Sequence, residues 1–341
     1  MKLAMGRGNF TGWGVCATNL REQANFFPAV QGVTVHSVSN HAMEPLCPEQ
    51  WDKINVGYFV FEDDQTVMRL ASSDQYKAYD LIVTMSSWCQ RKLNDAGIDA
   101  PVALQGIDHD LFKPLPLPDN DWFTVFSGGQ FSFRKGQDIV LAAMKVFMER
   151  HADVRLVCSW HSAWNNVMET MAASDLIDYW HDEDTAKAIV DAIVGAGLDT
   201  RRIININALV ENTDMPQVYA LADIGLFPNR CEGANNMVMS EFMACGRTVI
   251  ASNRTGHAEV ITENNSFPLR HYTPVALTDG DNLTAVWPVP SVDEVIETLE
   301  TAYLDRSLCK EKSEWAVKTM ECLTWSGTYE SLYRAACGIS R

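Results

Sequence analysis

The chain of 341 residues contains 47% hydrophobic and 21% charged residues, and its formal net charge is −17. This composition is typical of a folded globular protein, and the length favours about two domains of roughly 150 residues each. Proteins that bind nucleic acid rely on basic surface to displace counterions from the phosphates. The acidic balance therefore excludes nucleic acid as an expected partner.

The sequence also indicates where the protein works. No apolar run approaches the roughly 18 residues that cross a membrane, and residues 1–6 are too short for a secretory signal, so we expect no stable membrane insertion. The nine cysteines are scattered, with no Cys-x-x-Cys pair. They favour reduced thiols and a cytoplasmic location, and they argue against a zinc site.

Strands and helices alternate in the first half of the chain. We expect strands at 2–5, 32–37, 55–61, 81–85 and 102–104, helices at 15–24 and 88–96, and a glycine-rich loop at 6–14. Near-continuous apolar runs are typical of strands buried on both faces, and the alternation is typical of a parallel sheet. Three alternate prolines, Pro114, Pro116 and Pro118, then form a stiff connector at the domain boundary.

The alternation restarts in the second half. We expect strands at 122–127, 154–158, 202–208, 224–228 and 248–252, and helices at 138–149, 215–221, 236–245, 257–261, 292–304, 308–322 and 328–337. The predicted fold class is therefore α/β, with doubly wound domains at 1–115 and 122–325. Because open α/β sheets bind ligands at the carboxyl ends of their strands, we expect the site in a cleft between the two domains.

The segment 227–246 has the pattern of a diphosphate site. A buried strand ends at Pro228, and a turn of small and amide residues leads into a helix that Gly246 terminates. Free N–H groups at the start of a helix attract phosphate. Two carboxylates flank the turn, Glu232 and Glu241, and carboxylates there accept hydrogen bonds from the diol of a ribose or pyranose. The alternative is an amphipathic helix with a loop-capping Glu232 and a solvated Glu241.

A second segment, 127–138, also follows a strand and is rich in Gly and Ser. It places Arg134 and Lys135 directly before a helix, where their charges would neutralise a diphosphate leaving group. The alternative is a surface loop that carries two solvated cations.

Taken together, the motifs resemble a known family. Three blocks, 105–114, 133–138 and 232–246, are similar to motifs of the retaining nucleotide-sugar transferases of glycosyltransferase family 4, which have the two-domain GT-B fold. The opening segment 11–20 and the closing segments 249–253 and 256–261 are also similar to that family. The blocks keep the family order and span almost the whole chain.

The resemblance implies a retaining hexosyltransferase with two Rossmann-like domains. Such an enzyme would move a sugar from a UDP-, GDP- or ADP-sugar to a hydroxyl of a carbohydrate or small-molecule acceptor, and it would need no metal or other cofactor. The domain at 1–115 would bind the acceptor and the domain at 122–325 the donor. The C-terminal helix at 326–341 would pack back on the N-terminal domain.

The resemblance also assigns roles to single residues. Lys135 and Arg134 would face the diphosphate, Glu232 the hydroxyls of the transferred sugar, Glu241 the ribose, and Glu62 the acceptor side. The predicted catalytic residues are thus Lys135, Arg134, Glu232 and Glu62. The predicted donor-binding residues are Gly12, Gly14, Gly129, Gln130, Asn235, Asn236, Met237, Val238 and Glu241.

The chain departs from the family pattern at two points that concern the site. Eight residues separate Glu232 from Glu241, where the family most often has seven. The arginine of the family's phosphate loop is absent, and Gly129 and Gln130 stand near its place. Arg134 is then the candidate substitute for that arginine.

Three alternative functions remain open at this stage. The glycines Gly6, Gly8 and Gly12 suit a dinucleotide-binding dehydrogenase, but the second predicted strand ends in 36–39, His-Ser-Val-Ser, without the expected acidic residue. A metal-dependent glycosyltransferase would use Asp108 and Asp110 as an Asp-x-Asp metal site. A non-catalytic nucleotide-sugar binder would share the fold without the chemistry.

Overall fold

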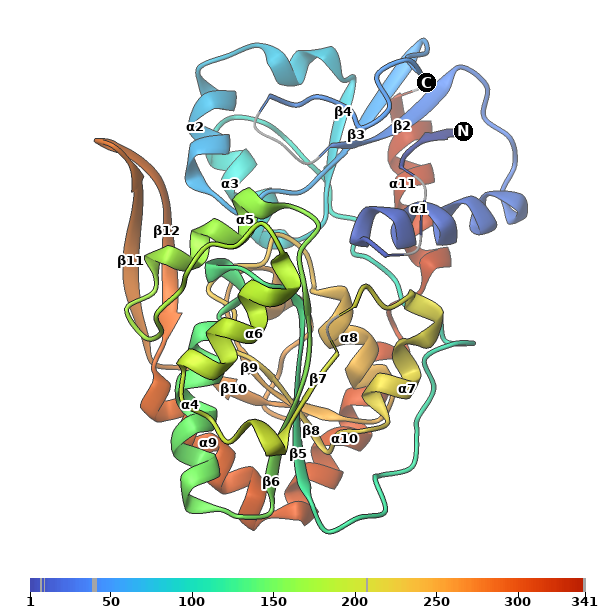
Figure 1. The fold of residues 1–341 in the computed structure, drawn as a ribbon. Coiled ribbons are helices and arrows are strands. Elements are labelled where there is room, and N and C mark those ends of the chain that lie inside the picture. The colour runs from blue at the N-terminus through green and yellow to red at the C-terminus, as the bar shows by residue number, and fades with distance from the viewer. Residues whose placement is uncertain (7, 9, 39–41, 207, 340–341) are drawn as a thin grey trace.

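The computed structural model describes residues 1–6, 8, 10–38, 42–206 and 208–339. Six residues of predicted segments lie outside this description, namely Arg7, Asn9, Ser39, Asn207, Ser340 and Arg341. Figure 1 shows two α/β units, one above the other, with the first third of the chain forming the upper unit. Among the described residues, no helix combines the length and the apolarity needed to cross a bilayer.

The N-terminal unit is a parallel sheet with the strand order β1-β2-β3-β4. Its elements are β1 (Lys2–Ala4), α1 (Gly12–Gln23), β2 (Val33–Val38), β3 (Ile54–Phe59), α2 (Asp64–Ala71), β4 (Leu81–Thr84) and α3 (Ser87–Asp95). Each of the three helices is capped at its N-terminus by a side chain that accepts a hydrogen bond from a backbone N–H of the first turn. The capping residues are Thr11, Asp63 and Ser86. The strand expected at 102–104 is reduced to one bridge between Val102 and Thr84.

The C-terminal unit is a parallel sheet of six strands in the order β10-β9-β8-β5-β6-β7. Its strands are β5 (Phe123–Gln130), β6 (Val154–His161), β7 (Ile203–Asn205), β8 (Ile224–Phe227), β9 (Thr248–Ser252) and β10 (Phe267–Leu269). Its helices are α4 (Gln137–Arg150), α5 (Asn165–Glu169), α6 (Thr185–Gly195), α7 (Met215–Tyr219), α8 (Met237–Ala244), α9 (Val292–Leu304) and α10 (Arg306–Met320).

One predicted helix of this unit is wrong. The segment expected at 257–261 is a 3-10 turn over Thr255–Glu259. Its Gly256 packs so tightly on the loop before α8 that an added Cβ would lie 2.1 Å from the carbonyl oxygen of Ala234. The Gly256 N–H also donates to the carbonyl of Glu232 at 2.7 Å. This contact with another loop sets the backbone in place of the helical ladder.

A β-hairpin, which the sequence patterns did not indicate, leaves the C-terminal unit between β10 and α9. It consists of β11 (Tyr272–Asp279) and β12 (Asn282–Pro290), paired antiparallel and joined at Gly280, which has φ +56°. Glycine suits this turn because it adopts positive φ without strain. In Figure 1 the hairpin, in orange, runs up beside α2 of the N-terminal unit.

Two chain segments cross between the units side by side. Ile107 pairs with Thr324, and the N–H of Ile107 donates to the carbonyl of Leu323 at 3.1 Å. At Gly106 an added Cβ would lie 2.2 Å from the backbone nitrogen of Trp325, so only glycine fits where the two crossings touch. The second crossing leads into α11 (Trp325–Ile339), which packs on α1 and β4 in the N-terminal unit.

The proline connector is fixed to the C-terminal unit. The buried guanidinium of Arg247 donates to the carbonyls of Leu115 and Pro116 at 2.9 and 2.6 Å. The N–H of Leu115 donates to the carbonyl of Cys245 at 3.0 Å, just after α8. The stiff segment after the first crossing therefore lies against the helix that opens the predicted donor site.

Candidate active site

The four predicted catalytic side chains meet between the two units. Lys135 Nζ lies 2.6 Å from Glu232 Oε1, and Arg134 Nη1 lies 3.2 Å from Glu232 Oε2. Arg134 Nη1 is also 3.7 Å from Glu62 Oε1, which comes from the N-terminal unit. The residues follow the carboxyl ends of β3, β5 and β8, so three loops that are distant in sequence supply one cluster of charges.

The opposite charges of Lys135, Arg134 and Glu232 stabilise one another in a site that is largely shielded from water. Burial alone would raise the pKa of Glu232, but the nearby cations Lys135 and Arg134 lower it to about 2. The carboxylate, only 4% exposed, is thus ionised at neutral pH and accepts hydrogen bonds without donating any. Burial opposes the charge of Arg134, yet Glu62 and Glu232 raise its pKa above the ordinary value.

A second ion pair, deeper in the molecule, fixes the turn that carries the two cations. The guanidinium of Arg230 donates to both carboxylate oxygens of Asp138 at 2.7 Å and to the carbonyl of Phe133 at 2.6 Å. It also lies 3.6 Å above the centre of the Phe133 ring. The backbone N–H of Arg230 donates to the carbonyl of Arg134 at 2.8 Å. The sequence patterns gave neither Arg230 nor its partner a role, because nothing local marks two distant charges as a pair.

The loop after β8 is anchored on both sides of Glu232. The Glu232 N–H donates to Thr255 Oγ1 at 2.9 Å, and the Asn229 side-chain amide donates to the Glu232 carboxylate. Next to it, Gly233 lies so close to the N-terminal unit that an added Cβ would be 2.4 Å from the carbonyl oxygen of Phe61. The loop after β3 and the loop after β8 therefore touch directly at this glycine.

Asn236 caps the helix α8 in an unusual backbone conformation. It has φ +55°, which costs a non-glycine residue on the order of 1–3 kcal/mol, and its Oδ1 accepts from the N–H of Met239 at 3.3 Å. Its Nδ2 lies 3.0 Å from His257 Nε2, while His257 Nδ1 lies 3.2 Å from the carbonyl of Ser252. Burial lowers the pKa of His257 to about 4, so the ring is neutral, donates from Nδ1 and accepts at Nε2.

The other predicted residues of this helix start surround that cap. The side chain of Asn235 is fully buried and donates to the carbonyl of Gln105 at 3.1 Å, while its Oδ1 has no hydrogen-bond partner among the described residues. An added Cβ on Gly12 would lie 3.7 Å from Met237 Cε, so the glycine loop of the N-terminal unit faces the start of α8. Val238 packs into the core beneath β5.

The remaining predicted donor-binding residues, Gly129, Gln130 and Gly14, have different surroundings. Gly129, at the end of β5, has φ +115° and open space where a Cβ would stand. The backbone carbonyl of Gln130 accepts from Gln137 at the start of α4. At Gly14 an added Cβ would lie 2.6 Å from the carbonyl oxygen of Gly8, so this position is glycine because α1 packs on its own preceding loop.

Glu241 is buried on α8, away from the charge cluster. Its two oxygens accept from Asn212 Nδ2 at 2.8 Å and from the hydroxyl of Tyr219 at 2.9 Å. Burial raises its pKa to about 7, and these two hydrogen bonds only partly oppose the increase. The alternative of a solvated Glu241 is therefore wrong, because the side chain is 3% exposed and lies between α8 and α7.

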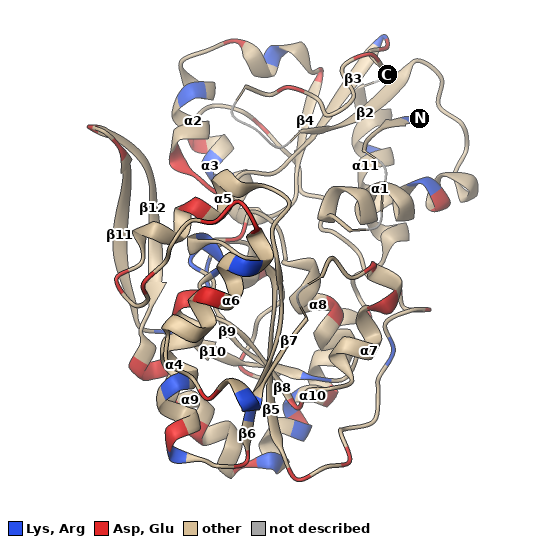
Figure 2. Ribbon diagram, viewed as in Figure 1, with Lys and Arg blue, Asp and Glu red and all other residues tan. Residues whose placement is uncertain are grey.

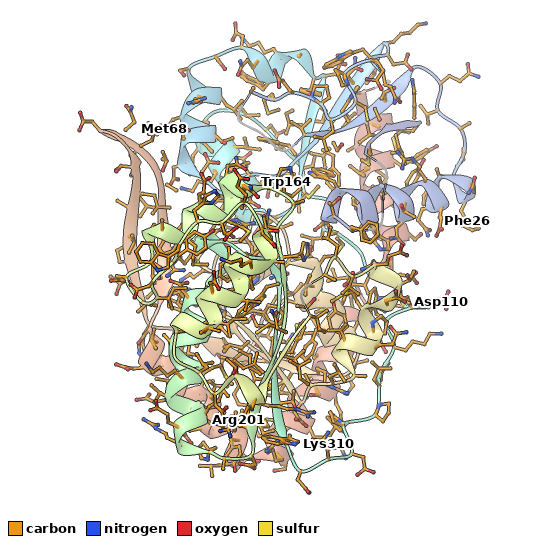
Figure 3. The ribbon with its side chains drawn as sticks, in the orientation of Figure 1. Phe26, Met68, Asp110, Trp164, Arg201 and Lys310 are labelled. Atoms are coloured by element: carbon orange, nitrogen blue, oxygen red, sulfur yellow. The ribbon has the colours of Figure 1, made fainter. Side chains whose placement is uncertain are left out.

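The Asp-x-Asp triplet forms a turn at the first crossing. Asp108 Oδ1 accepts from the N–H of Asp110 at 2.9 Å, and His109 Nε2 lies 3.0 Å from the carbonyl of Leu323. Asp110 projects outward, away from both sheets (Figure 3). Within the described part of the chain, no group of three or more His, Cys, Asp or Glu side chains is arranged to hold a metal ion.

Sequence comparisons relate the C-terminal unit to glycosyltransferases. Residues 180–280 match the family model described as Glycosyl transferases group 1, and this stretch contains Glu232 and Glu241. Spore coat protein SA of Bacillus subtilis (strain 168) is 24% identical over 143 residues, which make up 42% of this chain. The match spans 33% of that relative, about a third of its length.

Structural comparisons cover nearly the whole chain. Sucrose-phosphate synthase from Thermosynechococcus elongatus has a TM-score of 0.65 and 15% identity over 94% of this chain and 78% of its own. A glycosyltransferase from Rickettsia africae has a TM-score of 0.63 and 14% sequence identity, and the match covers 99% of this chain and 84% of that one. Anabaena HepE, solved with UDP and glucose, has a TM-score of 0.60 and 16% sequence identity, and the match covers 95% of this chain and 75% of that one. At these identities the likeness concerns the fold, and it confirms the predicted α/β GT-B architecture of two Rossmann-like units.

The buried carboxyl of Glu241 should make stability depend on pH. Its pKa is about 7 in the folded protein and 4.5 as an ordinary glutamate, so its contribution to folding is fully present below pH 4.5 and is lost as the pH rises through 7. Glu241→Gln should remove this loss. When the pH is raised from 5 to 8, the free energy of unfolding of the wild type should fall by about 2 kcal/mol more than that of the variant, measured by denaturant titration.

The exposed Glu314→Gln is the control for removal of one negative charge, and it should follow the wild type at both pH values. Parallel curves for wild type and Glu241→Gln would show that the carboxyl of Glu241 is not titrating in this range.

Proposed function

We propose that this protein is a glycosyltransferase that moves a sugar from a nucleotide diphosphate sugar to an acceptor hydroxyl. The observation that carries the proposal is the buried cluster of Lys135, Arg134 and Glu232 between two Rossmann-like units. The match of residues 180–280 to a glycosyltransferase family supports it. The donor would be a UDP-, GDP- or ADP-sugar and the acceptor a carbohydrate or small molecule, and HepE is a structural neighbour solved with UDP-glucose.

The cluster explains how a diphosphate would be held and released. Lys135 now pairs with Glu232, and a diphosphate that enters the site would take over this cation. Glu232, freed from Lys135 and still ionised, would then accept hydrogen bonds from the sugar hydroxyls. Two fixed cations stabilise the negative charge that develops on the leaving diphosphate, and such electrostatic stabilisation is a main source of rate acceleration in many enzymes.

The bond changes of the proposed transfer are simple. The bond between C1 of the sugar and the diphosphate oxygen breaks, and C1 forms a bond to the acceptor oxygen. The proton of the acceptor hydroxyl passes to the departing diphosphate. We propose retention of configuration, with Glu62 on the acceptor side and the Glu241 carboxyl near the ribose.

Charge is distributed in keeping with small-molecule substrates. Figure 2 shows Lys and Arg interspersed with Asp and Glu along both units, without a continuous basic segment. The cations that matter for the proposal are instead buried in the cluster, where their attraction for a diphosphate is screened little by solvent.

The first experiment is a screen for donor binding. UDP-, GDP- and ADP-sugars are added to the protein, and thermal unfolding is followed. A ligand at 100 times its dissociation constant adds about 2.7 kcal/mol, which raises the melting temperature by about 5 °C. The free nucleosides, which lack the diphosphate, are the matched controls and should give a smaller shift. If no nucleotide sugar raises the melting temperature, the proposed function is wrong.

The reaction should not need a metal ion. Asp108 and Asp110 are used in a turn and a surface ion pair, and the cations of the cluster supply the charge that a metal provides in other transferases. Turnover of the sugar nucleotide found in the screen should be the same with and without excess EDTA. Loss of activity in EDTA that Mg²⁺ or Mn²⁺ restores would instead favour metal-dependent transfer.

Lys135→Ala should lower kcat/KM for release of the nucleoside diphosphate by at least about tenfold, or about 1.4 kcal/mol of barrier. The variant removes the cation that the diphosphate would contact. Lys145→Ala, an exposed lysine of the following helix, is the matched control and should retain wild-type kinetics. Wild-type kinetics in Lys135→Ala would refute the phosphate role of Lys135. Nucleotide binding with neither transfer nor hydrolysis in the wild type would identify a non-catalytic binder.

A further inference from the structure

The β11–β12 hairpin links the two units on the side of Glu62. It belongs to the C-terminal unit by chain order, but β12 packs against α2 of the N-terminal unit. The backbone N–H of Val286 donates to Asp64 Oδ2 at 2.8 Å, in the first turn of α2. The other carboxylate oxygen of Asp64 pairs with Lys92 of α3. The hairpin is therefore attached to the N-terminal unit through a carboxylate that is itself held in place.

The next residue of the hairpin, Trp287, contacts two of the three loops that carry the charge cluster, those of Glu62 and of Arg134. Its indole N–H donates to the carbonyl of Glu62 at 2.7 Å. Its ring centre lies 6.4 Å from that of Phe133, with 33° between the ring planes. Phe133 begins the turn that carries Arg134, and Glu62 is the acceptor-side carboxylate paired with Arg134.

Glu62 depends on this contact more than the other members of the cluster do. It lies after the end of β3 and before the cap of α2, outside the sheet ladder. Its side chain is 33% exposed and its ion pair with Arg134 spans 3.7 Å, and such an exposed, long ion pair orders a side chain weakly. The hydrogen bond from Trp287 instead holds the backbone of Glu62 directly.

We infer that Trp287 is a positioning residue that fixes Glu62 beside Arg134 and thereby sets the acceptor side of the site. The expected effect on kinetics rests on the proposed function. The ordering of Glu62 by Trp287 does not depend on that function. A segment of the donor-side unit thus determines the geometry of the acceptor-side carboxylate, and the nucleotide itself is held by other residues.

The test is Trp287→Phe, which keeps an aromatic ring against Phe133 and removes the N–H. Amide exchange of the peptide 60–66 should become about fivefold faster, the effect of one lost hydrogen bond. Affinity for UDP, measured by calorimetry, should stay within about twofold. With UDP-glucose and water as acceptor, where water replaces UDP at C1, kcat should fall about fivefold while KM stays within about twofold.

Val286→Ala is the matched control. It is the neighbouring residue on the same strand, its side chain is 45% exposed, and its contact with Asp64 uses the backbone N–H, which the variant retains. It should behave as the wild type in all three measurements. An equal increase of exchange in Val286→Ala would mean that any change in the hairpin loosens the loop, which overturns the role of Trp287.

A double-mutant cycle tests the link to Glu62. If Trp287 acts through Glu62, then Glu62→Gln should lower kcat by itself, and adding Trp287→Phe should lower it little further. Additive losses, or unchanged exchange of 60–66 in Trp287→Phe, would overturn the inference. If the wild type neither binds UDP nor hydrolyses UDP-glucose, the proposed function is unsupported for this donor, while the exchange measurement still decides whether Trp287 orders Glu62.

Discussion

The burial of Glu232 between two cations is the constraint on which the rest of the structure depends. A buried carboxylate is tolerated only where opposite charges and hydrogen bonds replace its water, and Lys135 and Arg134 supply both. These two cations are in turn held in place because Arg230 and Asp138 fix the turn that carries them. The charges between the units are thus supported by a deeper ion pair within the C-terminal unit. In the proposed function, a diphosphate would replace one partner in a network that is already ordered.

Glycine stands where backbones touch at two places near the junction of the units. Gly106 lies against Trp325 where the two crossing segments meet, and Gly233 of the C-terminal unit lies against Phe61 of the N-terminal unit beside the charge cluster. A side chain at Gly106 would push the crossing segments apart, and a side chain at Gly233 would separate the units. The separation would move Glu62 away from Arg134, because these two residues belong to different units. Close packing at the glycines and the geometry of the charges are therefore parts of one arrangement.

The helix α8 combines a strained start with a buried acid. The positive φ of Asn236 is stabilised by a contact with the neutral His257, and Glu241 on the same helix is buried and accepts hydrogen bonds from Asn212 and Tyr219. Strained backbone and shifted pKa values tend to occur at functional sites, where the surrounding structure offsets their cost. In the proposed function, the start of α8 and its middle, where Glu241 lies, would serve different parts of a donor.

The sequence by itself determined the two α/β units, because buried parallel strands are apolar runs whose pattern is local. It also indicated Arg134, Lys135 and Glu232, because they follow the ends of predicted strands, and the carboxyl ends of the strands of one parallel sheet lie at the same edge. Glu62 was indicated only by the family resemblance. Only the tertiary structure decided that Lys135 pairs with Glu232, that Glu241 is buried, and that a hairpin carries Trp287 to the other unit. These outcomes depend on contacts between residues far apart in the chain, and no local periodicity or spacing records such contacts.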